Sequence, residues 1–236
     1  MRLVIHMVAR NEANRYLDAC LAHAKTISNE IFVWDDCSTD DTVEIARSHG
    51  AFVASRGENR PSFIEDESEF RSDGWVVMKT VLNLSEGDWV LTIDADEFLV
   101  GDVEGAIQSA EEVGYKTLRV EIPEMFLLDP LSRRVDGFWG KIDGFRLTQY
   151  VPGDQRFRPG MGCGTLPAYA DRGFNSQKIQ LLHLGYAAVE DRHDKYNRYS
   201  QISDNGHNSR HIQSILAPPS LVLWDGETPS IWRGKK

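Results

Sequence analysis

The first half of the chain alternates between short apolar runs and amphipathic stretches, and this alternation constrains the fold most strongly. Strand-like apolar runs occupy residues 2–9, 30–34, 51–54 and 90–93. Apolar residues at helical spacing occupy residues 13–25, 42–49 and 75–84. Such repetition is typical of α/β proteins. We therefore expect a Rossmann-like, mostly parallel central sheet flanked by helices.

The second half has a looser pattern. Strands are expected at residues 117–122, 144–148 and 179–184, and a charged, Tyr-rich helix at 189–202. Residues 55–70 and 150–176 are predicted to be irregular. A chain of 236 residues is long enough for one sizeable core, so we expect a single domain over residues 1–236 with a C-terminal helical extension.

Composition narrows the class of protein. No run approaches the roughly 18 apolar residues of a membrane span, and the N-terminus has no signal-peptide pattern, so we expect a soluble, cytoplasmic protein. Cys20, Cys37 and Cys163 are far apart, which favours reduced thiols over a disulfide framework or a zinc knuckle.

The charge balance argues against a dedicated nucleic-acid binder. The formal net charge is −10, whereas tight duplex binding relies on a basic face. Basic residues do cluster in three segments of the second half, which could form either a local basic surface or an ordinary solvated face. These segments are Arg133-Arg134, Arg156 to Arg158, and Arg192 to Arg198.

An acidic motif follows the last strand of the first half. The apolar run at 90–93 leads directly into Asp94, Ala95, Asp96 and Glu97. If the chain stays extended, Asp94 and Asp96 project to the same side about 6.5–7 Å apart and can share one ion. Carboxylate oxygens suit Mg²⁺ or Mn²⁺. The alternative is a strand-to-helix turn in which one aspartate caps the next helix.

Two more polar clusters follow predicted strands, at residues 9–12 and 35–41. Ligands of doubly wound sheets bind outside the carboxyl ends of the strands. The three clusters are therefore expected to meet at one edge of the sheet. For Asp35 and Asp36 the alternative is helix capping, which Ser38, Thr39 and Asp40 could already provide.

Taken in order, these motifs resemble the family-two glycosyltransferases of GT-A fold. The resemblance rests on Ala9-Arg10-Asn11-Glu12, Trp34 to Thr42, Phe70-Arg71 and Asp94 to Glu97. It is strong over residues 1–100, weaker through His183 to Tyr186 and Lys195 to Tyr199, and lost in the tail. It implies a nucleotide-sugar-binding half at 1–100, an acceptor-binding half at 101–205 and a C-terminal tail at 206–236.

The resemblance also implies roles for individual residues. The donor site would contain Ala9, Arg10, Glu12, Asp35, Asp36, Arg71, Asp94, Ala95 and Lys195. The metal ligands would be Asp94, Asp96 and His183. The cofactors would be Mn²⁺ or Mg²⁺, with His183 favouring Mn²⁺, and a nucleotide-sugar donor, expected to be a UDP-sugar. Such a donor carries a diphosphate, which an acidic cleft holds only with a cation between them.

Several assignments leave alternatives open. Glu12 could simply open the first helix, and His183 could be a core or surface residue. Lys195, Arg198, Tyr196 and Tyr199 share helical spacing and could contact the diphosphate or only cover the sheet. The Gly- and Pro-rich segment 157–167 could be a loop over the sugar and acceptor or a rigid surface loop.

The mechanism of family-two members is usually inverting and needs a base that takes a proton from the acceptor hydroxyl. Asp96, as the direct metal ligand, belongs to the expected catalytic set. The base is not identified by the sequence; the candidates are Glu97, Glu124, Asp143 and Asp171. Only Trp139 among the tryptophans is expected to be exposed for sugar stacking.

The acceptor stays open between a glycan, a protein and a modified nucleic acid base. Two other functions compete with sugar transfer. A nucleotidyltransferase would also use paired aspartates, but residues 8–12 contain no glycine for a phosphate loop. A catalytically silent glycan- or partner-binding module would keep the fold, and Asp94, Asp96 and His183 argue against it.

Overall fold

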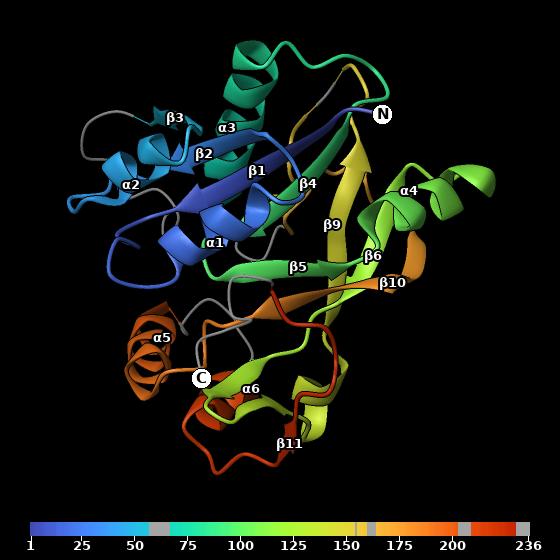
Figure 1. Ribbon diagram of the computed structural model, residues 1–236. Helices are drawn as coiled ribbons and strands as arrows, with labels where there is room; N and C mark the ends of the chain where they lie inside the picture. Colours follow the sequence, from blue (N-terminus) through green and yellow to red (C-terminus); the bar gives the residue numbers. More distant parts are fainter. Residues whose placement is uncertain (57–66, 154, 160–163, 203–208, 230–236) are drawn as a thin grey trace.

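The computed structural model describes residues 1–56, 67–153, 155–159, 164–202 and 209–229. Its first half alternates strands and helices as expected (Figure 1). The elements are β1 (Leu3–Ala9), α1 (Leu17–Ala24), β2 (Glu30–Asp35), α2 (Thr42–Ser48), β3 (Phe52–Ser55), α3 (Glu67–Val81) and β4 (Trp89–Asp94). Parallel pairing joins β3, β2, β1 and β4 in that spatial order, so their carboxyl ends meet at one edge.

The second half extends this sheet and adds a smaller one. Its elements are β5 (Glu97–Gly101), α4 (Val103–Glu112), β6 (Thr117–Glu121), β7 (Met125–Leu128), β8 (Leu131–Arg134), the 3₁₀ helix η1 (Gly137–Lys141), β9 (Asp143–Gln149), β10 (Phe174–His183), α5 (Val189–Ile202), α6 (Ser209–Ile215) and β11 (Leu221–Leu223). The large sheet has the order β3-β2-β1-β4-β9-β6-β10-β5, and the small sheet β11-β8-β7.

The large sheet carries the core on both faces. Strand β1 alternates its side chains, so that Ile5 lies in a cluster with Leu21 of α1 while Val4 lies in a second cluster with Trp75 of α3. These side chains are fully buried. Each strand presents apolar residues to both faces of the large sheet, so helices cover both faces.

The helix and strand boundaries differ from the expected ones in three places. The helix expected at 13–25 begins only at Leu17, because Asn11 adopts a left-handed φ of 53° and the amide of Arg15 closes a turn on the carbonyl of Glu12. The loop expected at 55–70 contains the first turn of α3, whose acidic residues suit a helix N-terminus. The irregular stretch expected at 150–176 ends early, at the start of β10.

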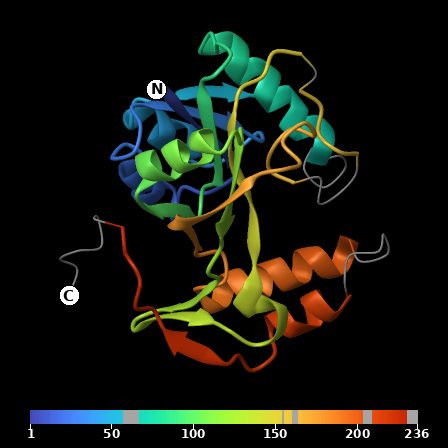
Figure 2. The ribbon, with the colours of Figure 1, turned by 90° about the vertical axis from the view of Figure 1, so that its right-hand side faces the viewer.

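The lower end of the molecule contains β7, β8, η1, α5, α6 and β11 (Figure 2). Trp139 is buried there, not exposed as expected, because it packs edge-on against Phe126 and Tyr186. Arg134 is also buried: its guanidinium lies against the Trp139 ring and pairs with Asp136 at 2.7 Å.

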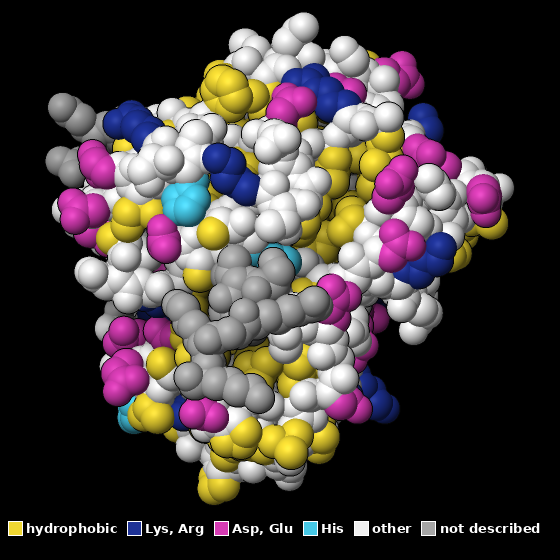
Figure 3. All heavy atoms as spheres, viewed as in Figure 1, with side chains coloured by type: hydrophobic (Ala, Val, Ile, Leu, Met, Phe, Trp, Pro, Cys, Tyr) yellow, Lys and Arg dark blue, Asp and Glu magenta, His cyan; other side chains and the backbone are white. Residues whose placement is uncertain are grey.

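The three basic segments do not form one solvated face. Arg192 donates to the carbonyls of Phe126 and Tyr186, and Lys195 is buried. In Figure 3, charged side chains of both signs are interspersed, and hydrophobic ones gather at the lower end. Leu221, Val222 and Leu223 of β11 are exposed. Among the described residues, no helix combines the length and apolar character needed to cross a bilayer.

Candidate active site

A cavity of about 350 Å³ lies where β1, β2 and β4 end. Its lining residues are Val8, Ala9, Arg10, Glu12, Arg15, Asp36, Phe70, Asp94, Ala95, Asp96, His183, Lys195, Arg198 and Tyr199. The three polar clusters thus meet at one edge. They do so because the parallel register places Val8 beside Asp94, and Ala9 beside Asp35. A larger cavity of about 850 Å³ lies at the opposite strand ends, around Leu3 and Glu30, away from the acidic motif.

The loop after β1 is tied to the loop after β2. The amide of Asn11 donates to Ser38 Oγ, the amide of Thr39 donates to Asn11 Oδ1, and the amide of Glu12 donates to Thr42 Oγ1. Of the side chains expected to cap α2, Ser38 and Asp40 accept hydrogen bonds from the first loop, Asp40 from the Ala13 amide at 3.2 Å, and so help to hold the two loops together. The alternative in which Glu12 begins the first helix is wrong, because α1 begins five residues later, at Leu17.

Asp35 and Asp36 take different roles. Asp35 is buried behind the cavity, where its carboxylate accepts hydrogen bonds from the Ser38 amide and, at 2.8 Å, from Ser55 Oγ. Asp36 lines the cavity and pairs with Arg10 at 3.2 Å. Of the two aspartates, Asp36 is the one that a ligand in this cavity can reach.

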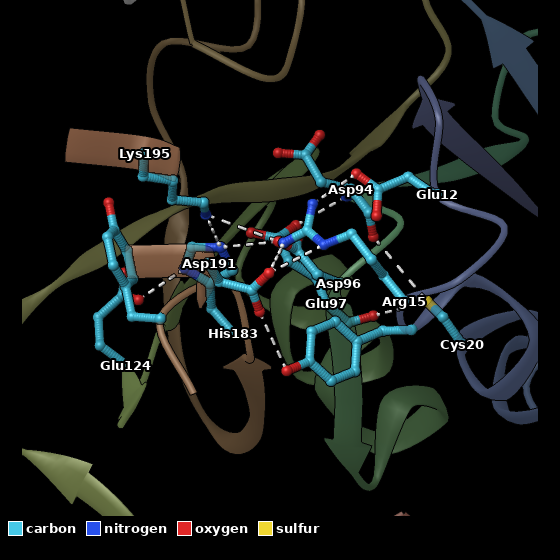
Figure 4. A network of polar contacts seen from close by, with 12 residues as sticks. Glu12, Arg15, Cys20, Asp94, Asp96, Glu97, Glu124, His183, Asp191 and Lys195 are labelled. Carbon is cyan, nitrogen blue, oxygen red and sulfur yellow. Dashed lines mark hydrogen bonds and ion pairs between the residues drawn. The ribbon is translucent and has the colours of Figure 1, made fainter. Parts of the chain in front are cut away.

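Glu12 and Arg15 link the first loop to the late helix α5. Arg15 pairs with Glu12 at 3.0 Å and with Asp191 of α5 at 2.9 Å, and Asp191 also accepts from the Tyr16 hydroxyl (Figure 4). Burial raises the pKa of Glu12 to about 7, against the opposing charge of Arg15. The contact between Arg15 and Asp191 therefore ties the cavity wall to a residue 176 positions away in the chain.

The acidic motif turns instead of staying extended. β4 ends at Asp94, and Glu97 begins β5, which pairs with β10 at the far edge of the sheet. A Glu97 oxygen accepts from the Asp94 amide at 2.9 Å, and its other oxygen pairs with Arg146 at 2.8 Å. Because of this turn, the side chains of Asp94 and Asp96 point in different directions. In an extended strand they would have pointed to the same side.

Asp94 points toward α3. Its Oδ1 lies 3.8 Å from the buried guanidinium of Arg71, which is itself paired with Glu67 at 2.8 Å. Arg71 therefore lies behind Asp94 and not on the cavity wall. The Asp94 side chain is 40% exposed, so it remains accessible to a ligand.

Asp96, His183 and Lys195 converge on one point (Figure 4). Asp96 Oδ2 lies 3.6 Å from His183 Nε2 and 3.6 Å from Lys195 Nζ, and the Nζ and Nε2 atoms are 3.2 Å apart. Burial acts to raise the pKa of Asp96, but Lys195 and His183 outweigh it and hold that pKa well below its usual range. Asp96 is therefore a carboxylate at neutral pH.

Glu124 fixes the orientation of His183. The imidazole Nδ1 donates to Glu124 Oε2 at 2.6 Å, which leaves Nε2 directed toward Asp96. A carboxylate behind the distal ring nitrogen is the usual support of a metal-bound histidine. Glu124 is thus placed to hold His183, and it is not among the residues that line the cavity.

The residues around this point fit a divalent cation in part. Two ligands of one ion, each bonded at about 2.1 Å, lie at a separation like the 3.6 Å between Asp96 and His183. Gly185 leaves the space open, since an added Cβ would lie 2.6 Å from Asp96 Oδ2. Among the described residues, no three His, Cys, Asp or Glu side chains surround a common point. The third polar group at this point, beside Asp96 and His183, is the Lys195 ammonium, which cannot bind a cation.

The candidate bases fall into two groups. Glu97 and Glu124 are buried and engaged, with Arg146 and His183 respectively. Asp143 and Asp171 line a second cavity, of about 510 Å³, to which Arg146 also belongs. The Arg146–Glu97–Asp94 contacts connect the two cavities.

The Gly- and Pro-rich loop predicted at residues 157–167 is described only in part, since Gly160 to Cys163 lie outside the described residues.

A family model decides the classification. The model for glycosyl transferase family 2 matches residues 4–174. The chain belongs to this family. Relatives of this chain include an uncharacterised glycosyltransferase of Rickettsia typhi, which is 31% identical over 132 residues, covering 54% of this chain and 40% of the relative. An uncharacterised protein of Mycobacterium tuberculosis is 31% identical over 105 residues, covering 43% of this chain and 25% of that protein.

One solved structure shares the fold over most of this chain. S. aureus TarS residues 1–349 align with 92% of this chain and 70% of that chain at 17% identity and a TM-score of 0.50. M. tuberculosis glucosyl-3-phosphoglycerate synthase, in complex with Mn²⁺, UDP-glucose and phosphoglyceric acid, aligns with 52% of this chain and 44% of that chain at 19% identity and a TM-score of 0.34. The GT-A fold expected for a family-2 member is confirmed.

Three residues of the site carry no role in the sequence-based assignment. Arg15 and Asp191 are recognisable only in space, since their pairing spans the whole domain. Gly185 had a sequence signal, because it follows His183 by two residues at the end of a predicted strand. A glycine beside a candidate ligand can mark a position where a side chain would block the site.

Proposed function

We propose that this chain is a metal-dependent, inverting glycosyltransferase. It moves a sugar from a nucleoside diphosphate donor, uridine-based as the family resemblance implies, to an acceptor hydroxyl. The observation that carries the proposal is the pair of Asp96 and His183, 3.6 Å apart in the cavity at the strand ends. Cytoplasmic location stays a prediction from the sequence.

The cation would be held by Asp96 and His183, with Asp94 within reach of its open positions or of the ribose. When bound, it would neutralise the diphosphate and stabilise its departure. The chain supplies the surroundings: Glu124 holds the imidazole, and Arg10, Arg15 and Lys195 give the cavity positive charge beside its carboxylates. Asp36 and Glu12 are placed to accept from or donate to the nucleoside.

The second cavity is the proposed acceptor site. Asp143 and Asp171 line it, and their carboxylates are the candidate bases that are not buried behind other side chains. A base must lie within hydrogen-bond reach of the acceptor hydroxyl. All four candidates are paired with a basic side chain, but Asp143 and Asp171 are about half exposed beside Arg119 and Arg158. Glu97 and Glu124 are buried beside Arg146 and His183, so they are better explained as positioning residues.

Donor hydrolysis tests the proposal. Nucleotide sugars are incubated with Mn²⁺ or Mg²⁺, and diphosphate release is compared between the wild type and Asp96→Asn. We expect release from one donor to depend on the metal and to fall at least about 100-fold in the variant. Asp18→Asn is the matched control, since Asp18 loses the same charge on the exposed side of α1.

The competing functions predict other outcomes. A silent binding module would bind a nucleotide or glycan and release no diphosphate with any donor. A nucleotidyltransferase would release pyrophosphate from a nucleoside triphosphate. If calorimetry detects neither metal-dependent nucleotide binding nor donor hydrolysis, the proposed donor site is wrong.

A further inference from the structure

We propose that the Lys195 ammonium and the divalent cation are alternative occupants of one position, and that donor binding draws Lys195 out of it. The inference rests on the proposed function, because it concerns the same metal and the same donor. It makes Lys195 a positioning residue that couples metal binding to donor binding.

The contacts of Lys195 place a fixed positive charge at the metal ligands. Its Nζ lies 3.6 Å from Asp96 Oδ2, 3.2 Å from His183 Nε2 and 4.4 Å from the centre of the Tyr186 ring. Lys195 is 8% exposed, so this charge is held away from bulk water. The ammonium therefore lies beside both Asp96 and His183, at distances similar to the 3.6 Å that separates those two side chains.

A metal ion and the ammonium cannot both occupy this place. An ion bonded at about 2.1 Å to both Asp96 Oδ2 and His183 Nε2 would lie no more than about 4 Å from Nζ. Like charges at that separation repel strongly in a buried site. The backbone closes the other side, since a Cβ at Gly185 would lie 2.0 Å from Nζ and 2.5 Å from Nε2.

The donor offers the ammonium another partner. Lys195 and Arg198 line the same cavity on α5, and an ammonium on a flexible four-carbon stem can turn toward a diphosphate in that cavity. Its departure would free Asp96 and His183 for the metal. Metal and nucleotide would then each tighten the binding of the other by the same factor.

Manganese affinity measures the competition directly. Mn²⁺ binding is measured by electron paramagnetic resonance, with and without UDP, for the full chain and for Lys195→Met. We expect Lys195→Met to bind Mn²⁺ alone at least tenfold more tightly than the wild type. UDP should tighten Mn²⁺ binding strongly in the wild type and much less in the variant. Equal or weaker Mn²⁺ binding by Lys195→Met without UDP would overturn the inference.

Arg198→Met separates occupancy from a general charge effect. Arg198 carries the same charge in the same cavity and lies against the Tyr199 ring, 5.2 Å from its centre. Its removal should change Mn²⁺ affinity less than threefold, and a tenfold gain would contradict competition for one position. If Lys195→Met fails to fold, Lys195→Gln keeps the chain length without the charge.

If the wild type binds neither Mn²⁺ nor UDP, the proposed function fails and the inference fails with it. If both bind normally and only the Lys195→Met effect is absent, the inference alone fails.

Discussion

His6 lies in the middle of β1 with its ring between aromatic side chains. It stacks on Phe32 with ring centres 5.9 Å apart and lies 6.1 Å from Trp75. It is fully buried, and neither ring nitrogen has a hydrogen-bond partner in the described part of the chain. Burial lowers its pKa to about 3, so the ring is neutral in the folded protein.

The folded protein should therefore lose stability in acid through His6. The unfolded chain binds a proton near pH 6.5 and the folded chain only near pH 3, so stability is lost as the pH falls between these values. From pH 7 to pH 5 the loss is about 2 kcal/mol. We expect His6→Leu to remove this part of the pH dependence, measured by urea unfolding at both pH values. Parallel curves for both proteins would show that His6 does not contribute.

Single residues were predictable where the chemistry was local. Asp36, Asp94, Asp96 and His183 were assigned to a site, and all four line one cavity. Glu97 of the same acidic motif is buried and does not line it. Asp35 was assigned with Asp36, but Asp35 is the last residue of β2 and accepts from Ser55 of the neighbouring strand, whereas Asp36 follows the strand and lines the cavity. Trp139 was predicted to be exposed from its Gly-rich surroundings, which carry no information about the distant aromatic residues that cover it.

The turn between β4 and β5 depends on one buried ion pair. Glu97 and Arg146 pair with side-chain exposures of 3% and 13%, and Glu97 also holds the Asp94 amide. Burial raises the pKa of Glu97, against the opposing charge of Arg146. The positive charge of Arg146 therefore stabilises the carboxylate of Glu97, which is buried.

Removing Arg146 should expose this dependence. Arg146→Leu leaves Glu97 buried without its partner, and we expect a loss of about 3 kcal/mol in the free energy of unfolding. Combining it with Glu97→Gln should recover more than half of that loss, because the amide oxygen can still accept from Asp94. Chemical denaturation of both single variants and the double variant measures the coupling. Additive losses would contradict a direct interaction.

Elements of the first half were predictable because their periodicity is regular. β5 and α4 were not anticipated, although Phe98 to Val100 is an apolar run and Asp102 caps α4 by accepting from the Gly105 amide. The position of β5 was beyond prediction in any case. It leaves the acidic turn and pairs with β10, a strand some eighty residues later, and no local pattern encodes that partner.

Residues 209–229 are part of the folded molecule. β11 pairs with β8, Arg134 donates to the Ser214 carbonyl at 2.7 Å, and Trp139 Nε1 donates to Ser214 Oγ at 3.1 Å. Ile215 is buried in the same cluster as Trp139. The lower end of the molecule is therefore closed by α6 and β11.

A chain ending at residue 202 should be strongly destabilised. It would lose the Ser214 partner of the buried Arg134 and uncover Trp139 and Phe126, so we expect a loss of at least about 4 kcal/mol or failure to fold. Thermal unfolding followed by circular dichroism, together with tryptophan emission, tests this. A truncated chain that melts within a few degrees of the full chain would show that the segment is dispensable.

The antiparallel pairing of β5 with β10 places His183 opposite Glu97, one residue from Asp96. Successive side chains of a strand face opposite ways, so a slip of one residue would present a leucine, Leu182 or Leu184, in place of the imidazole. Such a molecule would keep strands of the same length but would lack the imidazole beside Asp96. Spectroscopy of the backbone would therefore not distinguish the correct register from the shifted one. Ligand binding is the assay that distinguishes them.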